Sequence, residues 1–279
     1  MKTADKYMKF VFTSGWDNEM VIAFLKDLPF NSFEERDDGV IAYLPQKEAN
    51  DALLKKIYDT CERYSIRCEH ELVENKNWNA IWESKFEPVA IDNFCLIKAA
   101  FHKDLDTSGY EYVIDITPEM TFGTGHHETT WMMIKMMSEM NLQNKKILDF
   151  GAGTGILSIL AEKMGAKEIL AVDNDPVAVD NIKKNAASND CKKIKALLGD
   201  TVDYGNFVFD AVFANINRNV LLEEAQRLSL SLKKGGFLLL SGILTADKQM
   251  IVDAFEGNSM KLMKSMSKDK WSALKFIAY

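Results

Sequence analysis

The sequence is poor in the residues that build metal centres and disulfide frameworks. It has four cysteines and four histidines among 279 residues. The cysteines (Cys61, Cys68, Cys95 and Cys191) stand alone, without CxxC or CxxH spacing. These spacings exclude the common sequence patterns of zinc sites and of small disulfide-rich domains. We therefore expect reduced thiols that serve in packing.

Long apolar runs and an excess of positive charge are also missing. The N-terminus lacks the apolar core of a signal peptide, and the apolar run at 237–244 is far shorter than a membrane span. We therefore expect a cytoplasmic protein that does not contact membranes. The net charge of −7 argues against broad electrostatic capture of nucleic acid and favours a cationic partner.

The hydrophobic content of 47% is enough for a buried core, and a length of 279 residues suggests about two domains, with a single large α/β domain as the alternative. The first 74 residues show the period-2 and helical patterns of a βαββαβ order, with a two-residue hairpin turn at Asp38-Gly39. This order predicts a ferredoxin-like α+β domain over 1–74. The expected strands and helices are 7–14 (strand), 17–28 (helix), 30–37 and 40–46 (hairpin strands), 48–64 (helix) and 67–74 (strand).

This N-terminal segment carries most of the negative charge. It holds 10 Lys and Arg against 15 Asp and Glu, a balance of −5. The third strand offers only Tyr43 and no aromatic run of the kind that RNA-recognition domains use, so we do not expect direct sequence-specific nucleic-acid binding. The acidity fits either a solvated surface or a site for a basic protein, and the sequence leaves both open.

Residues 75–93 are the expected linker helix between the domains. Trp78, Trp82 and Phe86 are spaced by four and form one stripe, which Pro88 ends. Such a stripe is more often buried core than a surface for a partner. From Phe94 the pattern predicts a hairpin-like pair of strands at the start of a second domain, 94–279.

A βαβ unit over 145–176 carries the clearest chemical signal. Gly151, Gly153 and Gly155 follow an apolar strand and precede a helix, so backbone amides become available to a ligand. The spacing differs from the dinucleotide fingerprint GxGxxG, because Ile156 stands where the third glycine would be. Together with Asp149 and Asp173, this glycine spacing predicts a site for an adenosine-type cofactor, in which Asp173 accepts hydrogen bonds from the ribose hydroxyls. A purely structural turn is the weaker alternative.

Polar residues end the next two strands. Asp200 follows one strand and can reach an adenine amino group, but a purely structural role in a turn explains this aspartate equally well. The strand expected over 209–216 brings Asn215 to its carboxyl end, the edge where open α/β sheets bind ligands. Its carbonyl can accept a hydrogen bond from a nucleophilic amine, and turn capping is the alternative. Asp175, followed by Pro176, is expected to cap the next helix.

A Gly/Thr-rich loop over 117–130 runs into a Met-rich helix. Gly123 and Gly125 suit a loop that lies close to a ligand, and Thr129 or Thr130 can place a hydroxyl at the helix start. His126 and His127 lack the helical HxxxH spacing of a metal site, so we expect no metal.

Together these motifs resemble the class I S-adenosylmethionine-dependent methyltransferases, and more narrowly the bacterial ribosomal protein L11 methyltransferase family. The resemblance spans nearly the whole chain and rests on FGTGHHETT at 122–130, DFGAGTGIL at 149–157, VDNDP at 172–176 and ANI at 214–216. It implies a Rossmann-like seven-stranded sheet with the last strand antiparallel, behind the ferredoxin-like domain. The sequence departs from the family pattern at Glu128, Ala152 and Asn217-Arg218.

The resemblance implies methyl transfer from S-adenosylmethionine, with S-adenosylhomocysteine as product, to the N-terminal α-amine and lysine ε-amines of ribosomal protein L11, free or on the large subunit. The acidic N-terminal domain would hold this basic protein. Asn215, which orients the amine, Phe122 and His127 are the expected catalytic residues. The expected cofactor-binding residues are Thr124, Gly125, Thr130, Asp149, Gly151, Gly153, Gly155, Asp173, Asp200 and Asn215.

Two alternatives remain from the sequence. One is an N-methyltransferase of another protein or of a small amine, with the N-terminal domain selecting the substrate. The other is a non-catalytic adaptor that retains the cofactor pocket, against which the presence of Asp149, Asp173 and Asn215 counts.

Overall fold

The computed structural model divides into two compact units, residues 1–85 and 86–279. It describes residues 7–16, 18–25, 28–30, 32–36, 39–73, 87–99, 101–117, 125–199 and 208–279. The aromatic stripe of Trp78, Trp82 and Phe86 lies outside the described residues. Each unit is described by itself below.

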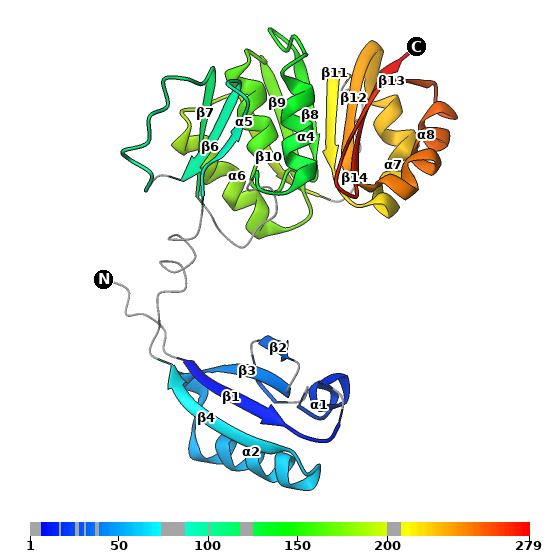
Figure 1. The fold of residues 1–279 in the computed structure, drawn as a ribbon. Helices are drawn as coiled ribbons and strands as arrows, with labels where there is room; N and C mark the ends of the chain where they lie inside the picture. Colours follow the sequence, from blue (N-terminus) through cyan, green and yellow to red (C-terminus); the bar gives the residue numbers. More distant parts are fainter. Residues whose placement is uncertain are drawn as a thin grey trace. The chain divides into compact units, whose positions relative to one another are not determined.

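The first unit is a four-stranded antiparallel sheet with two helices (Figure 1). The strand order is β2-β3-β1-β4, as expected for the predicted βαββαβ sequence of elements. Its core contains Phe10, Phe12, Leu44 and Ile57, all fully buried. The elements are β1 (Tyr7–Thr13), α1 (Asn18–Leu25), β2 (Ser32–Arg36), β3 (Gly39–Pro45), a 3₁₀ turn η1 (Gln46–Glu48), α2 (Asp51–Arg63) and β4 (Arg67–Val73).

The β2–β3 connection differs from the prediction by one residue. Arg36 pairs with Gly39, so Gly39 belongs to strand β3 and not to the turn. Its φ is +146°, and a Cβ atom there would lie 2.1 Å from the carbonyl oxygen of Phe12. The glycine is therefore required by the close approach of β1, which the turn rule does not take into account.

The second unit is built on a seven-stranded sheet of order β10-β9-β8-β11-β12-β14-β13. The first five strands in this order are parallel, and β14 is antiparallel to both of its neighbours. This is the predicted Rossmann-like sheet with an antiparallel last strand. Its strands are β8 (Lys146–Phe150), β9 (Glu168–Asp173), β10 (Ile194–Leu198), β11 (Phe209–Asn215), β12 (Leu232–Leu244), β13 (Met260–Lys268) and β14 (Trp271–Ala278).

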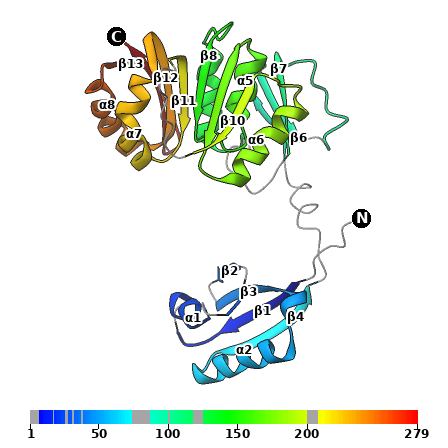
Figure 2. The same cartoon turned by 180° about the vertical axis from the view of Figure 1, so that it is seen from behind.

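Helices cover both faces of this sheet (Figures 1 and 2). On one face α4, α5 and α6 pack, and on the other α7 and α8. The strands alternate between the two apolar layers, so Ile147 faces one and Leu148 the other. The helices are α4 (Glu128–Met137), α5 (Ile156–Lys163), α6 (Pro176–Ser188), α7 (Arg218–Leu230) and α8 (Lys248–Glu256), with a 3₁₀ turn η2 (Thr245–Asp247) before α8.

A separate three-stranded sheet of order β5-β6-β7 precedes α4, and here the predicted hairpin is wrong. Strand β6 (Cys95–Ala99) pairs in parallel with β7 (Tyr112–Ile116), and antiparallel with β5 (Val89–Ile91). Residues 89–91, expected in the linker, are thus a strand of the second unit. Burial of β6 and β7 against the α4/α5 layer, through Ile97 and Ile114, favours this arrangement over a local hairpin.

Asn185 of α6 and Asn189, the C-cap residue of this helix, hold the end of β7 by side-chain hydrogen bonds. Asn189 accepts a hydrogen bond from the Asp115 N–H through Oδ1 (2.9 Å) and donates through Nδ2 to the Asp115 carbonyl (2.5 Å). One turn earlier, Asn185 accepts from the Thr117 N–H and donates to the Thr154 carbonyl, both at 2.9 Å. Asn185 is fully buried and therefore links the end of β7 directly to the glycine-rich turn.

Within the described part of the chain, no helix is long and apolar enough to cross a membrane. All four cysteines, each of them described, are free thiols, and Cys61 and Cys95 are buried.

We expect Asn189→Ala to lower the free energy of unfolding by about 2–3 kcal/mol, because it leaves the Asp115 N–H without its acceptor. Chemical denaturation of the full chain measures this loss. The matched control is Asn258→Ala, which removes one hydrogen bond to the Ala254 carbonyl at a helix end and should cost about 1 kcal/mol or less. Equal losses in the two variants would show that the link to β7 adds no special stability.

Candidate active site

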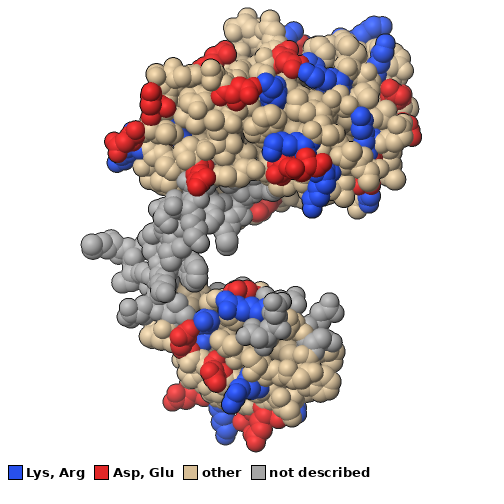
Figure 3. All heavy atoms as spheres, viewed as in Figure 1, with Lys and Arg blue, Asp and Glu red and all other residues tan. Residues whose placement is uncertain are grey.

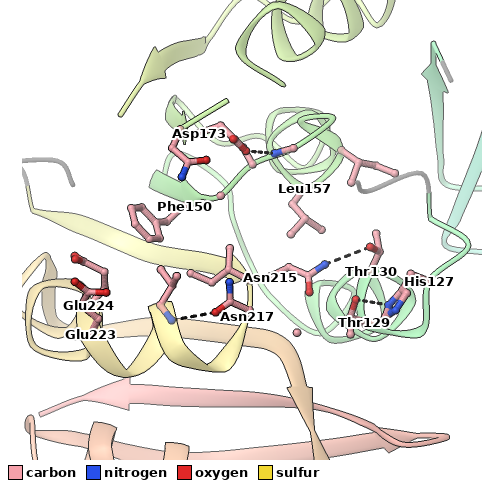
Figure 4. A pocket seen from close by; sticks show the side chains of 18 of the residues that line it. His127, Thr129, Thr130, Phe150, Leu157, Asp173, Asn215, Asn217, Glu223 and Glu224 are labelled. Carbon is pink, nitrogen blue, oxygen red and sulfur yellow. Dashed lines mark hydrogen bonds between the residues drawn. The ribbon is translucent and has the colours of Figure 1, made fainter. Parts of the chain in front are cut away.

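A cavity of about 540 Å³ opens at the carboxyl edge of the parallel strands (Figure 4). Its walls come from the turn after β8, the ends of β9, β10 and β11, the first turns of α4 and α7, and Trp271 at the start of β14. This is the edge at which open α/β sheets bind ligands. The size suits a cofactor or small ligand.

The structure brings six of the predicted site residues to this cavity, namely His127, Thr130, Gly151, Gly153, Asp173 and Asn215. Three others are described but do not line it, namely Gly125, Asp149 and Gly155. Phe122, Thr124 and Asp200 lie outside the described residues.

The glycine-rich turn after β8 has a backbone that only glycine adopts readily at its key position. Gly151 has φ +71°, and its N–H donates to the Val172 carbonyl at 2.8 Å. A Cβ atom at Gly151 would lie 2.2 Å from Cγ2 of Ile216. The turn therefore passes close to the β11–α7 connection and presents backbone, not side chains, to the cavity.

Ile216 lies between two glycines. On its other side, a Cβ atom at Gly242 of β12 would lie 2.2 Å from the Ile216 carbonyl oxygen. The chain between β11 and α7 is thus fixed by close contacts from two neighbouring strands. The position of Ile216 therefore fixes the places at which its two neighbours, Asn215 and Asn217, line the cavity.

Asp173 connects the end of β9 to the turn. Its Oδ2 accepts from the Gly153 N–H at 2.8 Å, and its Oδ1 accepts from the Asp175 N–H at 3.0 Å. A carboxylate has about four acceptor positions, so Asp173 retains capacity for ligand hydroxyls. The predicted cap of α6 is confirmed, because Asp175 accepts from the Val177 N–H and Pro176 is the first helical residue.

Asp149 is buried beneath the turn and caps α5 from below. Its Oδ2 accepts from the Ser158 N–H (3.1 Å) and from the Ser158 hydroxyl (2.7 Å). Burial raises the pKa of Asp149 to about 6; the hydrogen bonds from Ser158 oppose this shift, and the negative charge of Asp173 adds to it. The side chain positions the turn and the helix start, and does not line the cavity.

Asn215 has one half of its amide engaged and the other half available. Its Nδ2 donates to Oγ1 of Thr130 on α4 at 3.3 Å. Its Oδ1 is buried and has no hydrogen-bond partner within the described part of the chain. Figure 4 shows the side chain pointing toward Thr130 across the cavity. A buried carbonyl oxygen without a donor is costly, so this position is suited to a ligand N–H.

His127 is the N-cap residue of α4. The sequence predicted a hydroxyl of Thr129 or Thr130 at this helix start. The Nδ1 of His127 accepts from the Thr129 N–H at 3.3 Å and lies 2.8 Å from the Thr129 hydroxyl. The imidazole contacts the Trp271 ring edge-on, with centroids 4.9 Å apart. Both rings line the cavity.

The residues that depart from the family pattern after Asn215 have local structural roles. Asn217 caps α7 by accepting from the Val220 N–H at 3.1 Å. Arg218 turns to Asp247 of η2, with 2.9 Å between Nη1 and Oδ1. Of the two, only Asn217 lines the cavity.

Several lining residues have no signal in the sequence. Trp271 begins a strand about 140 residues after the Gly/Thr loop that it meets, and Phe150 is one apolar residue in an apolar strand. Glu223 and Glu224 belong to a helix with ordinary amphipathic composition. Only the fold brings them to the cavity.

The residues that the structure describes contain no cluster of three or more potential metal-ligating His, Cys, Asp or Glu side chains.

The sequence model of the family described as ribosomal protein L11 methyltransferase (PrmA) matches residues 19–278. The chain belongs to this family. Ribosomal protein L11 methyltransferases are similar over almost the full length: that of Phocaeicola vulgatus is 38% identical over 98% of this chain and 99% of its own. That of Chlorobaculum tepidum is 34% identical over 91% of this chain and 90% of its own.

Solved structures agree with the fold. The crystal structure of ribosomal protein L11 methylase from Lactobacillus delbrueckii subsp. bulgaricus is 25% identical, with a TM-score of 0.65, and covers 70% of this chain and 100% of its own. The predicted class I methyltransferase fold is thereby confirmed.

We expect the Asp149 carboxyl to make the protein less stable as the pH rises. Its pKa is raised in the folded state, from 3.8 to about 6, so the folded state holds the proton over a range where the unfolded state has lost it. Its contribution is fully present below about pH 4 and is lost as the pH rises through 6. The difference in unfolding free energy between wild type and Asp149→Asn should therefore fall by about 2–3 kcal/mol from pH 4 to 7.

Chemical denaturation of both proteins at several pH values measures this difference. Asp210→Asn is the control of opposite sign. Burial raises the pKa of Asp210, but hydrogen bonds from the Lys146 N–H and from Lys233 outweigh it and lower the pKa overall. A pH-independent difference for Asp149→Asn would contradict the prediction.

Proposed function

We propose that this chain transfers methyl groups from S-adenosylmethionine to the N-terminal α-amine and lysine ε-amines of ribosomal protein L11. Its family membership makes it an S-adenosylmethionine-dependent protein methyltransferase. The observation that supports amine chemistry is the buried Oδ1 of Asn215, which lines the cavity and has no donor in the described part of the chain.

The residues around the cavity fit this cofactor. Asp173 has acceptor capacity for the ribose hydroxyls, and the turn at Gly151 and Gly153 exposes backbone close to the ligand. Thr130 holds the Asn215 amide. Asp149 and Gly155 act behind them, by fixing the turn and the start of α5. The catalytic role of Phe122 and the cofactor contacts of Thr124, Gly125 and Asp200, which the family resemblance implies, remain part of the proposal.

The reaction requires alignment and a neutral amine. S-adenosylmethionine, when bound, supplies the methyl group and a sulfonium leaving group. An ordinary lysine, with a pKa of about 10.4, is neutral in about one molecule per thousand near pH 7.5, whereas an α-amine, with a pKa of about 7.7–8.0, is neutral in roughly a quarter to two-fifths of the molecules. Desolvation in the cavity lowers the pKa of the bound amine further.

Asn215 is placed to orient that amine. An N–H of the amine donates to Oδ1, which directs the nitrogen lone pair into the cavity, and the Thr130 contact prevents the amide from rotating away. The proton that the amine must lose passes to water. In this proposal His127 and Trp271 form the wall beside the reacting groups.

The first unit provides the recognition of ribosomal protein L11 in this proposal. Residues 1–74 carry a balance of −5, which complements a basic protein. On the face of this unit seen in Figure 3, acidic and basic side chains alternate, so the charge is spread and not gathered in one patch. We propose action on free or large-subunit-bound ribosomal protein in the cytoplasm, without direct sequence-specific nucleic-acid binding.

Mass spectrometry of ribosomal proteins tests the substrate. Ribosomes that lack the modification are incubated with the protein and S-adenosylmethionine, and mass increments of one methyl group are mapped. Increments confined to ribosomal protein L11 support the proposal. Methylation of other proteins with L11 unchanged would contradict it.

We expect Asn215→Ala to lower kcat at least about 100-fold, because the amine loses its orienting acceptor. The Kd for S-adenosylhomocysteine, measured by calorimetry, should change much less. The control Asn258→Ala, at a helix end away from the cavity lining, should leave both unchanged. Equal losses in kcat and in cofactor affinity would make Asn215 only a cofactor ligand.

A further inference from the structure

The cavity has a second polar end, formed by two carboxylates of α7. Glu223 and Glu224 both line it. Figure 4 shows them beyond Phe150 and Asn217, at the opposite end from Thr130 and His127. The methyl-transfer residues proposed above do not use this end.

Glu224 is buried and only half satisfied. The residue is 2% exposed, and its Oε1 accepts from Nη1 of Arg227 at 2.7 Å. Its Oε2 is buried and has no hydrogen-bond partner among the residues that the structure describes. A buried carboxylate oxygen without a donor is strongly unfavourable, so a ligand that brings an N–H to this position gains binding free energy.

The position along the cavity indicates which ligand group this is. This argument rests on the proposed function, in which Asp173 accepts hydrogen bonds from the ribose hydroxyls and Asn215 orients the amine that receives the methyl group. The base extends from the ribose away from the methyl group, and so toward the end of the cavity at which Figure 4 shows Phe150 and Glu224. At that end the cofactor's hydrogen-bond donor is the exocyclic amino group of adenine.

We propose that Glu224 Oε2 accepts a hydrogen bond from the exocyclic amino group of the adenine base, and so selects a 6-amino purine. That amino group has two N–H bonds, and Glu224 can accept one of them. A carboxylate acceptor favours an amino group and repels a carbonyl oxygen. The site therefore discriminates adenine from its 6-oxo analogue.

Calorimetry with S-adenosylhomocysteine and S-inosylhomocysteine, which carries a 6-oxo group, tests this on the full chain. Wild type should bind the adenosyl compound at least about tenfold more tightly. Glu224→Leu should reduce this preference at least about tenfold, and Glu224→Gln should reduce it less, because the amide keeps one acceptor oxygen. Glu256→Gln, an exposed glutamate at the end of α8, is the matched control and should keep the wild-type preference.

The outcomes separate the proposals. If wild type shows no preference for the adenosyl compound, the inference is overturned even if Glu224 variants fold poorly. An unchanged preference in Glu224→Leu also overturns it. If this variant in addition has a raised KM for ribosomal protein L11, the N–H donor to Glu224 belongs to the protein substrate. If wild type binds neither compound, the proposed function fails first. Adenosyl preference that depends on Glu224, without methylation of L11, would support the inference and contradict the proposed substrate.

Discussion

The arrangement of the active site depends on a steric constraint, the position of Ile216 between Gly151 and Gly242. Neither neighbour tolerates a Cβ atom, because each would come within 2.2 Å of an Ile216 atom. Three adjacent parallel strands, β8, β11 and β12, are thus brought close at their carboxyl ends. The side chains on either side of Ile216 gain their positions from packing and not from flexible loops. Asn215 can therefore keep an unsatisfied oxygen in place, at a cost that the surrounding sheet offsets.

Two aspartates that look alike in the sequence perform different tasks because of where the sheet places them. Asp149 is buried beneath the glycine-rich turn, and its Oδ2 accepts hydrogen bonds from the N–H and the hydroxyl of Ser158. Asp173 borders the cavity and uses only part of its capacity on backbone N–H groups. The buried carboxylate organises the helix start, and the bordering one remains available to a ligand. Charge repulsion between them contributes to the raised pKa of Asp149.

Features governed by local rules could be predicted from the sequence, and features governed by distant contacts could not. The strand-ending Asp173 and Asn215 and the Asp175 cap follow from patterns within a few residues. The predicted turn at Asp38-Gly39 is wrong by one residue, because the close approach of β1 requires the glycine within β3. The predicted hairpin after Phe94 is wrong, because packing against the α4/α5 layer favours parallel pairing of β6 with β7. Glu224 and Trp271 join the cavity only through the sheet topology, so no periodicity identifies them. Asp149 was assigned to cofactor contact because sequence spacing does not distinguish a residue on the cavity wall from one beneath it.

The two asparagines at the C-terminal end of α6 have a consequence for how the second unit opens. Asn185 joins the end of β7 to Thr154 in the glycine-rich turn, and Asn189 fixes Asp115 in the same strand. Local opening of the three-stranded sheet therefore breaks bonds to the turn as well, and the two behave as one cooperative unit. A ligand that binds the turn stabilises the folded state of this whole unit. Cofactor binding would thus slow amide exchange in β7, a strand that does not line the cofactor cavity.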